Sequence, residues 1–392
     1  MTIARRIADS LEAASWIRKM FEEGTALKAE HGADKVFDFT LGNPNVRPPD
    51  SFKQTLAEVA RDPGIDHAYM PNAGYMETRQ AVAAQVAAEQ NSPVTGEDII
   101  MTCGAAGGLN VILKAVLNPG ETVVVPTPFF VEYRFYIENH GGRMVTVPTG
   151  AGFDLDLAAL SGAIDENTRA VLINSPNNPT GAVYSAETLT RLAALLAEKA
   201  GHLGRNIYLI TDEPYRDIVY DGITVPPIFD KYADSIVVTS YSKTLSLPGE
   251  RIGFVAVNPA AACKKDLLPA MVFTNRVLGF VNAPALMQRV LARMPAERVN
   301  VNEYAGKREK LCRILSDCGY DFIKPAGAFY LFPKSPLADD VAFVPQLQKE
   351  LILAVPGSGF GGPGYFRLAF CVDDRTIDNA AEGFKRAIDA VK

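Results

Sequence analysis

The chain has 392 residues, of which 48% are hydrophobic and 21% charged, and its formal net charge is -6. The length predicts two or three domains, or one large and one small domain, with enough apolar residues for a sizeable core. No basic stretch is dense enough to favour nucleic-acid binding, and no apolar run reaches the roughly 18 residues that a membrane span needs.

Cysteine and histidine usage narrows the chemistry further. The five cysteines form no C-x-x-C pair, which favours thiols in a reducing compartment, and the four scattered histidines show no metal-ligand spacing. The N-terminus lacks the long apolar region of a secretory signal. We therefore expect a cytoplasmic protein with no catalytic metal, no nucleic-acid partner and no membrane segment.

The first half of the chain predicts an α/β sheet. A polar, alanine-rich stretch over residues 10–31 is predicted to be helical, and a turn-rich segment follows at residues 41–49. From about residue 74 to residue 285, helical segments alternate with short apolar runs. The runs are Ile99–Met101, Val123–Val125, Ala170–Ile173, Ile207–Ile210, Ile236–Val238 and Phe254–Val257. Because such runs are typical of strands buried on both faces, the pattern indicates a mainly parallel sheet.

The pattern changes after residue 285. Residues 286–318 are predicted to form one long, mostly helical segment, followed by strands at 329–332 and 365–370 and a last helix near 375–391. These elements predict a smaller α+β domain, with which the N-terminal helix is expected to pack. We expect a large domain over residues 47–285 and a small domain from residues 1–46 and 286–392.

Polar clusters follow five of the apolar runs. They are Thr102–Gly108, Pro126–Phe130, Asn174–Gly181, Thr211–Tyr215 and Thr239–Lys243. Because ligands bind outside the carboxyl ends of parallel strands, the five clusters are expected to converge on one crevice.

The run Ser240-Tyr241-Ser242-Lys243, with Arg251 eight residues further on, has the groups that pyridoxal phosphate (PLP) needs. A lysine can form a Schiff base with an aldehyde cofactor, and two hydroxyls and a guanidinium can hold a phosphate. Taken alone, the run also fits an ordinary solvated lysine.

In combination, four motifs make the chain resemble the class I/II aminotransferases, the fold-type I PLP enzymes, and aspartate aminotransferases in particular. They are S-P-N-N-P-T-G from Ser175, D-E-P-Y from Asp212, S-x-S-K-x(7)-R from Ser240 and F-R-L from Phe366. The resemblance spans Gly42 to Arg367. It implies a fold-type I α/β architecture, with a large domain around a mainly parallel sheet and a smaller α+β domain from both termini.

The resemblance implies roles for four residues around the cofactor ring. Lys243 matches the Schiff-base lysine, whose amine later carries the proton from the substrate Cα. Asp212 matches the aspartate that contacts the pyridine nitrogen, and Tyr215 and Asn178 match the groups that bind the phenolic oxygen. In isolation, Asp212 also fits a helix cap and Asn178 a plain turn.

The resemblance also implies a phosphate site and a stacking residue. The phosphate is expected to bind backbone N–H groups at a helix N-terminus, together with hydroxyls and a guanidinium. These groups belong to Gly104, Ala105, Ala106, Ser240, Ser242 and Arg251. Many relatives carry a hydroxyl or a lysine in place of Ala106, so one side-chain contact is put in doubt while the backbone contacts stay available. Phe130 matches the aromatic residue that stacks on the ring, and a core phenylalanine is the alternative.

Substrate residues follow from the same resemblance. Arg367 matches the arginine that clamps the α-carboxylate, with Gly42 and Asn178 beside it. Tyr69 matches a tyrosine that reaches the phosphate of a neighbouring subunit, which implies a homodimer with shared sites. Arg276 lies in the region where dicarboxylate-specific relatives place an arginine, although a surface or dimer-interface arginine is an equal alternative.

The expected function is a PLP-dependent aminotransferase with ping-pong chemistry. It is expected to move an amino group from an L-amino acid, with a preference for aspartate or another common amino acid, to a 2-oxo acid such as 2-oxoglutarate. The core motifs equally allow a carbon–sulfur β-lyase, an aminocyclopropane-carboxylate-forming synthase or a decarboxylase on the same scaffold. A non-enzymatic PLP-binding regulator is a remote alternative, because residues 1–40 are too short for a winged-helix domain.

Overall fold

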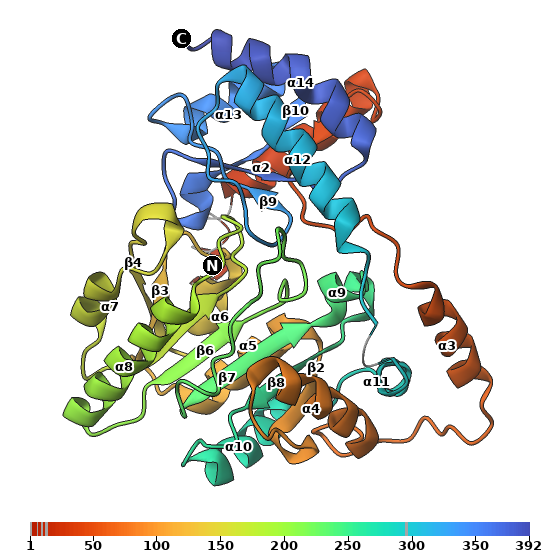
Figure 1. The fold of residues 1–392 in the computed structure, drawn as a ribbon, viewed down its shortest axis with the longest axis vertical. Helices are drawn as coiled ribbons and strands as arrows, with labels where there is room; N and C mark the ends of the chain where they lie inside the picture. The colour runs from red at the N-terminus through yellow and green to blue at the C-terminus, as the bar shows by residue number, and fades with distance from the viewer. Residues whose placement is uncertain (1, 6, 9–10, 12–14, 295–296) are drawn as a thin grey trace. The chain divides into compact units, whose positions relative to one another are not determined.

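The computed structural model describes residues 2–5, 7–8, 11, 15–294 and 297–392 (Figure 1). The chain forms two compact units. The larger unit comprises Pro44–Glu303 and Pro325–Ala328, and the smaller comprises Met1–Asn43, Tyr304–Lys324 and Phe329–Lys392. No helix within the described ranges is long and apolar enough to cross a membrane.

The division differs from the predicted boundaries at residues 44–46, 286–303 and 325–328, which we expected in the small domain. They lie in the larger unit, where α11 (Ala285–Ala292) packs against α3 (Asp50–Arg61) and α4 (Met76–Gln90). The Gln288 side-chain oxygen accepts a hydrogen bond from the Tyr75 N–H at 2.9 Å, and its carbonyl accepts one from Thr78 Oγ1 at 2.9 Å. These contacts between residues more than 200 positions apart hold α11 on the larger unit.

The larger unit is built around a seven-stranded sheet in the order β2-β8-β7-β6-β5-β3-β4. The strands are β2 (Ile99–Thr102), β3 (Thr122–Pro126), β4 (Arg143–Val147), β5 (Thr168–Asn174), β6 (Tyr208–Asp212), β7 (Ser235–Ser240) and β8 (Gly253–Val257). Strand β8 runs antiparallel to β2 and β7, and the remaining pairs are parallel. The predicted mainly parallel sheet is therefore confirmed.

One strand of this seven-stranded sheet was not predicted from the sequence. Strand β4 lies at the edge of the sheet and is partly exposed, from Arg143 at its start to Thr146 near its end. Its exposed positions are the polar residues Arg143 and Thr146, so β4 does not form a continuous apolar run.

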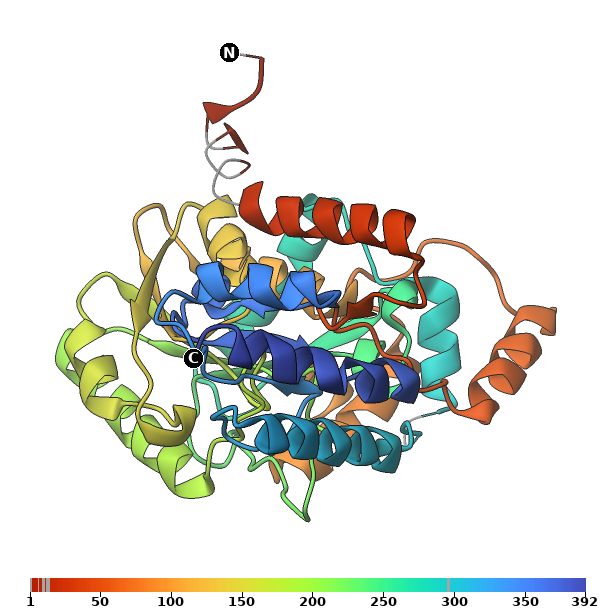
Figure 2. The same ribbon diagram turned by 90° about the horizontal axis from the view of Figure 1, so that it is seen from above.

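Helices cover both faces of this sheet (Figures 1 and 2). One core joins alternate strand residues such as Val123 and Val238 to α5 (Gly104–Val116), α6 (Glu132–Asn139) and α10 (Lys264–Val277). The other core joins the intervening residues, such as Val124 and Val237, to helices on the opposite face. These helices are α4, α7 (Leu157–Ala163), α8 (Ala186–Leu203) and α11. The alternation explains why the strands read as continuous apolar runs.

The smaller unit is α+β, as predicted. Its helices are α2 (Ser15–His31), α12 (Val301–Cys318), which begins in the larger unit, α13 (Asp340–Lys349) and α14 (Asp374–Asp389). Its strands are β1 (Phe37–Asp38), β9 (Tyr330–Leu331), β10 (Ile352–Leu353), β11 (Val355–Pro356) and β12 (Phe366–Ala369). Strand β1 pairs in parallel with β10, so both ends of the chain build this unit.

Two predicted helical segments differ from the helices in the structure. The helix expected from residue 10 is described as α2 from Ser15, and residues 9–10 and 12–14 lie outside the described residues. Residues 286–318 are mostly helical, as expected, but they form the two helices α11 and α12 and not one long helix. The sequence carries a proline at position 295, and proline cannot donate a helical backbone hydrogen bond.

Candidate active site

The carboxyl ends of the parallel strands meet at one edge of the sheet, as the sequence predicted. Asn174 at the end of β5 is in register with Asp212 at the end of β6, and Asp212 is in register with Val238 of β7. Ser240 at the end of β7 lies opposite Gly253, which also pairs with the end of β2. The polar clusters that follow these strands are thereby brought to a common edge.

Asp212 is the central acidic group at this edge. Its side chain is buried, and Tyr133 Oη donates a hydrogen bond to Oδ2 at 2.6 Å. Its other oxygen, Oδ1, is buried and has no hydrogen-bond partner among the described residues. Burial raises the pKa of Asp212 to about 7, against the lowering effect of the Tyr133 hydrogen bond and with a further rise from the charge of Glu213. A buried carboxylate oxygen needs a donor, and a protonated pyridine nitrogen supplies one.

Tyr133 is a residue that the sequence analysis missed. It lies on α6, is fully buried, and meets the ring of Phe130 edge to face with centroids 5.6 Å apart. Burial, followed by the negative charge of Asp212, raises its pKa well above the usual value, so the hydroxyl remains a donor. Tyr133 thus positions both Asp212 and Phe130. Only its spacing of three residues from Phe130 was visible in the sequence.

The loop after β5 is fastened to the end of β6. Asn174 Nδ2 donates to the Asp212 carbonyl at 2.7 Å, and its Oδ1 accepts from the Asn178 N–H at 2.7 Å. Asn178 and Tyr215 are both buried. The structure therefore places these two predicted residues in the loops that follow the adjacent strands β5 and β6.

A second group of predicted residues lies at the N-terminus of α5. Helix α5 begins at Gly104, whose φ is +71°, and a Cβ at this position would lie 2.9 Å from Arg251 Nη2. The Arg251 guanidinium thus lies against the first residue of α5, whose N-terminus also offers the N–H groups of Ala105 and Ala106. A helix N-terminus beside a guanidinium favours an anion such as phosphate.

Lys243 lies on the short helix α9 (Tyr241–Thr244), directly after β7. It is half-buried between the buried residues Ser242 and Thr244, and Ser240 is the last residue of the preceding strand β7. Strand β7 is the neighbour of β6, so Lys243 and Asp212 follow adjacent strands at the same edge. An unpaired carboxylate oxygen, a lysine and an anion-binding helix end are the groups that fit PLP.

The smaller unit brings Gly42 and Arg367 together. Arg367 on β12 is buried, and its Nη2 donates to the Thr40 carbonyl at 2.6 Å. Its guanidinium lies 4.7 Å from the ring centroid of Tyr330 and 4.5 Å from that of Phe360. A Cβ on Gly42 would overlap the Tyr330 hydroxyl, so only glycine fits there. Aromatic rings on the guanidinium hold it in one orientation.

Tyr69 and Arg276 are exposed on the surface of the larger unit. Tyr69 is 90% exposed, and Arg276 is exposed near the end of α10 over the ring of Phe273. Asn275 Nδ2 donates to the Asn72 carbonyl at 2.9 Å. This bond ties the end of α10 to the loop that carries Tyr69, so the two predicted residues belong to one surface region.

Comparisons with known proteins agree on one family. Residues 34–384 match the model of the family described as aminotransferase class I and II. The chain is 32% identical to a probable aspartate/prephenate aminotransferase of Aquifex aeolicus, with 91% of this chain and 92% of that protein covered. It is 30% identical to a probable N-acetyl-LL-diaminopimelate aminotransferase of Bacillus subtilis, with 92% and 90% covered.

Solved structures show the same likeness. An amino transferase from Eubacterium rectale has a TM-score of 0.96 and 37% identity, with all of both chains covered. An aspartate aminotransferase from Thermotoga maritima has a TM-score of 0.86 and 26% identity, with 98% of this chain and 99% of that chain covered.

Proposed function

Since this chain belongs to the class I and II aminotransferase family and is a PLP-dependent transaminase, we propose that Lys243 binds the cofactor and that Asp212 contacts its pyridine nitrogen. The observation that carries this assignment is the buried Asp212 Oδ1, which has no partner in the described chain. When bound, PLP supplies an electron sink for the charge that develops at the substrate Cα. Asp212 holds a proton at the pyridine nitrogen, and Tyr133 holds Asp212 in place.

The lysine and its neighbours act on the substrate proton. The Lys243 amine, on the turn after β7, would take the proton from the substrate Cα and would deliver it to the C4′ carbon of the cofactor. Tyr215 and Asn178 bind the phenolic oxygen, and the face of Phe130, held edge-on by Tyr133, covers the ring. These roles require side chains in fixed positions, and all four residues follow the carboxyl ends of strands in one sheet.

The phosphate is assigned to the N-terminus of α5 and the residues around it. The proximity of the Arg251 guanidinium to Gly104, the first residue of this helix, supports the assignment. The hydroxyls of Ser240, at the end of β7, and of Ser242, on α9, are the remaining proposed phosphate ligands. The proposed ligands are Gly104, Ala105, Ala106, Ser240, Ser242 and Arg251.

Arg367 is assigned to the substrate α-carboxylate. A planar guanidinium binds a carboxylate through two parallel hydrogen bonds, which fixes the orientation of the Cα–H bond. The hydrogen bond to the Thr40 carbonyl and the contacts with the two aromatic rings fix the Arg367 guanidinium, and Gly42 lies two residues after Thr40. Asn178 is proposed to contribute a further contact to the substrate.

For the amino donor we propose aspartate or another common L-amino acid, with 2-oxoglutarate as an acceptor. The similar proteins named above include aspartate/prephenate and N-acetyl-LL-diaminopimelate aminotransferases, whose donors differ. Arg276 is proposed to bind the distal carboxylate of a dicarboxylic donor. Its exposed position beside the Tyr69 loop favours a role in the site of a second subunit.

We further propose a homodimer with shared sites and a cytoplasmic location. The 90% exposure of Tyr69 is compatible with the first, because it leaves the phenol accessible to a second subunit, and tyrosine is enriched at subunit interfaces. No disulfide joins the five cysteines, all of which lie within the described ranges, and this supports a reducing compartment.

Two measurements on the purified holoenzyme test the assignment. Borohydride treatment followed by peptide mapping should place a pyridoxyl group on Lys243, and a label on another lysine would refute the central role of this residue. A panel of amino acids with 2-oxoglutarate, followed as glutamate formed, identifies the donor. Steady release of pyruvate and ammonia without any 2-oxo acid would point to a lyase instead.

A further inference from the structure

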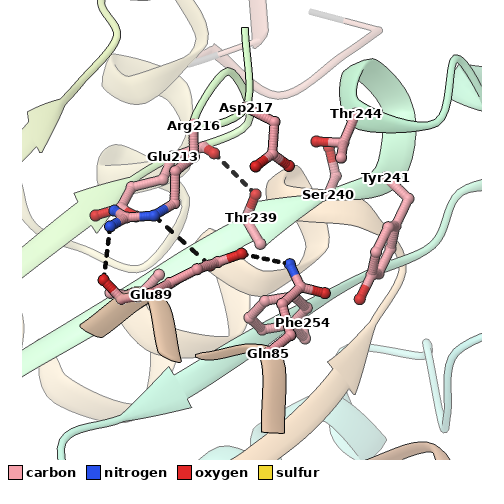
Figure 3. Close-up of a pocket in the computed structure, with 11 residues that line it drawn as sticks. Gln85, Glu89, Glu213, Arg216, Asp217, Thr239, Ser240, Tyr241, Thr244 and Phe254 are labelled. Carbon is pink, nitrogen blue, oxygen red and sulfur yellow. Dashed lines mark hydrogen bonds and ion pairs between the residues drawn. The ribbon is translucent and has the colours of Figure 1, made fainter. Parts of the chain in front are cut away.

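A cluster of five charged side chains includes residues of the turn after β6, and Figure 3 draws four of the five, Glu89, Glu213, Arg216 and Asp217. Successive strand residues point to opposite faces, so Asp212 meets Tyr133 of α6 while Glu213 turns toward α4. We call this set the buried charge cluster, and it consists of Glu89, Glu213, Arg216, Asp217 and Arg298. The cavity beside it has a volume of about 10 Å³, which is too small for a substrate.

Within the buried charge cluster, three carboxylates share two guanidiniums. Arg216 Nη1 lies 2.7 Å from Glu213 Oε2, and Arg216 Nε lies 3.6 Å from Glu89 Oε2. Arg298 Nε lies 2.6 Å from Asp217 Oδ2, and its Nη2 lies 3.4 Å from Glu89 Oε1. The side chains of Arg298 and Asp217 are about three-quarters buried, so their attraction is only partly screened by solvent.

Residues 298 and 299 together touch both turns that carry proposed cofactor ligands. The Arg298 side chain binds Asp217, two residues after Tyr215. The Val299 N–H donates to the Thr244 carbonyl at 2.9 Å, one residue after Lys243. The two contacts come from adjacent residues, so together they span the gap between the two turns.

We propose that Arg298 is a positioning residue for the transamination reaction, which fixes the turn of Tyr215 relative to the turn of Lys243 through its ion pair with Asp217. This inference rests on the roles proposed above for Lys243 and Tyr215. It assigns no contact between Arg298 and cofactor or substrate.

The charges of the cluster explain why the loss of Arg298 would move the turn. Burial and then the negative charge of Asp217 already raise the pKa of Glu89. Without the Arg298 guanidinium, Asp217 and Glu89 repel each other across a partly desolvated space. The turn that carries Tyr215 is then pushed from α4, and the Tyr215 hydroxyl binds the phenolic oxygen less well. Weaker stabilisation of the phenolate raises the pH midpoint at which the bound cofactor changes its absorbance.

The test uses holoenzyme variants Arg298→Met, Asp217→Asn and Arg298→Lys. Arg293→Met is the matched control, because Arg293 belongs to the same connecting segment but pairs at 3.3 Å with the half-exposed Asp62. The measurements are the pH midpoint of the cofactor absorbance, kcat, KM and the thermal midpoint. We expect Arg298→Met to raise the absorbance midpoint by roughly half a pH unit or more and to lower kcat about ten-fold, with KM changed less than about three-fold. Asp217→Asn loses the same ion pair but leaves no repulsion between residues 217 and 89, so it should shift the midpoint in the same direction by a smaller amount. Arg298→Lys should recover part of the shift, and Arg293→Met should resemble the wild type.

Two outcomes overturn the proposal. One is an unchanged absorbance midpoint in both Arg298→Met and Asp217→Asn, even if their thermal midpoints fall, because the pair would then be only structural. The other is an equal shift in Arg293→Met. Should Arg298→Met fail to fold, the milder Asp217→Asn decides by the same criterion. Borohydride mapping of each variant separates these outcomes from an error in the proposed function, which would place the label away from Lys243.

Discussion

Replacing Asp212 with asparagine should stabilise the cofactor-free protein while it abolishes most activity. Burial raises the pKa of Asp212 to about 7, against an ordinary value of 3.8. A group with a raised folded-state pKa contributes stability that is complete below the unfolded pKa and is lost as the pH rises through the folded pKa. The ionised carboxylate therefore lowers the free energy of unfolding between about pH 4 and pH 7.

The pKa difference between 3.8 and about 7, at about 1.4 kcal/mol per unit, corresponds to about 4 kcal/mol when the carboxyl is fully ionised. At pH 5 the folded protein still holds the proton, and the cost is about 1.7 kcal/mol. Asparagine has no charge to bury, and its Oδ1 can accept the Tyr133 hydrogen bond. The variant should thus gain about 2.5 kcal/mol more stability at pH 8 than at pH 5. Any pH-independent effect of the new amide cancels in this difference.

Urea unfolding of the cofactor-free proteins, followed by far-ultraviolet circular dichroism at pH 5 and pH 8, measures this difference. Asp266→Asn on α10 removes an exposed carboxylate and controls for the loss of one charge. Added PLP should stabilise the wild type at pH 8 far more than Asp212→Asn, because the pyridine nitrogen compensates the buried charge. An equal stability change at both pH values would refute the reasoning, since Asp212 would then not be desolvated in the folded protein.

Three further predictions concern other residues. Tyr133→Phe keeps the edge-to-face packing but removes the 2.6 Å hydrogen bond, and it should lower kcat about ten-fold or more by steady-state kinetics. Tyr136→Phe on the same helix is its control, and equal losses would contradict a specific role. Arg276→Ala should cost roughly 2–5 kcal/mol in kcat/KM for aspartate or glutamate and much less for alanine. An equal drop for all donors would indicate a structural or dimer-interface role. Refolding a mixture of inactive Lys243→Ala and Tyr69→Ala parents should recover activity, up to about a quarter of wild type, if Tyr69 serves the partner's site. No recovery with heterodimers present would exclude shared sites.

Much of the larger unit was predictable because its strands are buried on both faces. Five of the six apolar runs lie within strands β2, β3, β5, β7 and β8, and the sixth, Ile207–Ile210, overlaps β6. The carboxyl-end rule then placed Asp212 and Lys243 at one edge without any knowledge of distances. Edge strand β4 was missed, since its partly exposed residues do not form an apolar run.

The sequence by itself determined the α/β class and the motif residues, because apolar continuity and local spacing are properties of short segments. Only the tertiary structure decided which distant groups meet. The Tyr133–Asp212 hydrogen bond joins residues 79 positions apart, and the Arg298–Glu89 ion pair joins residues 209 positions apart. The placement of residues 286–303 in the larger unit likewise depends on the contacts of Gln288 with α4. Such contacts arise from the packing of whole helices onto the sheet. The pattern within one segment does not specify which distant residue it will contact.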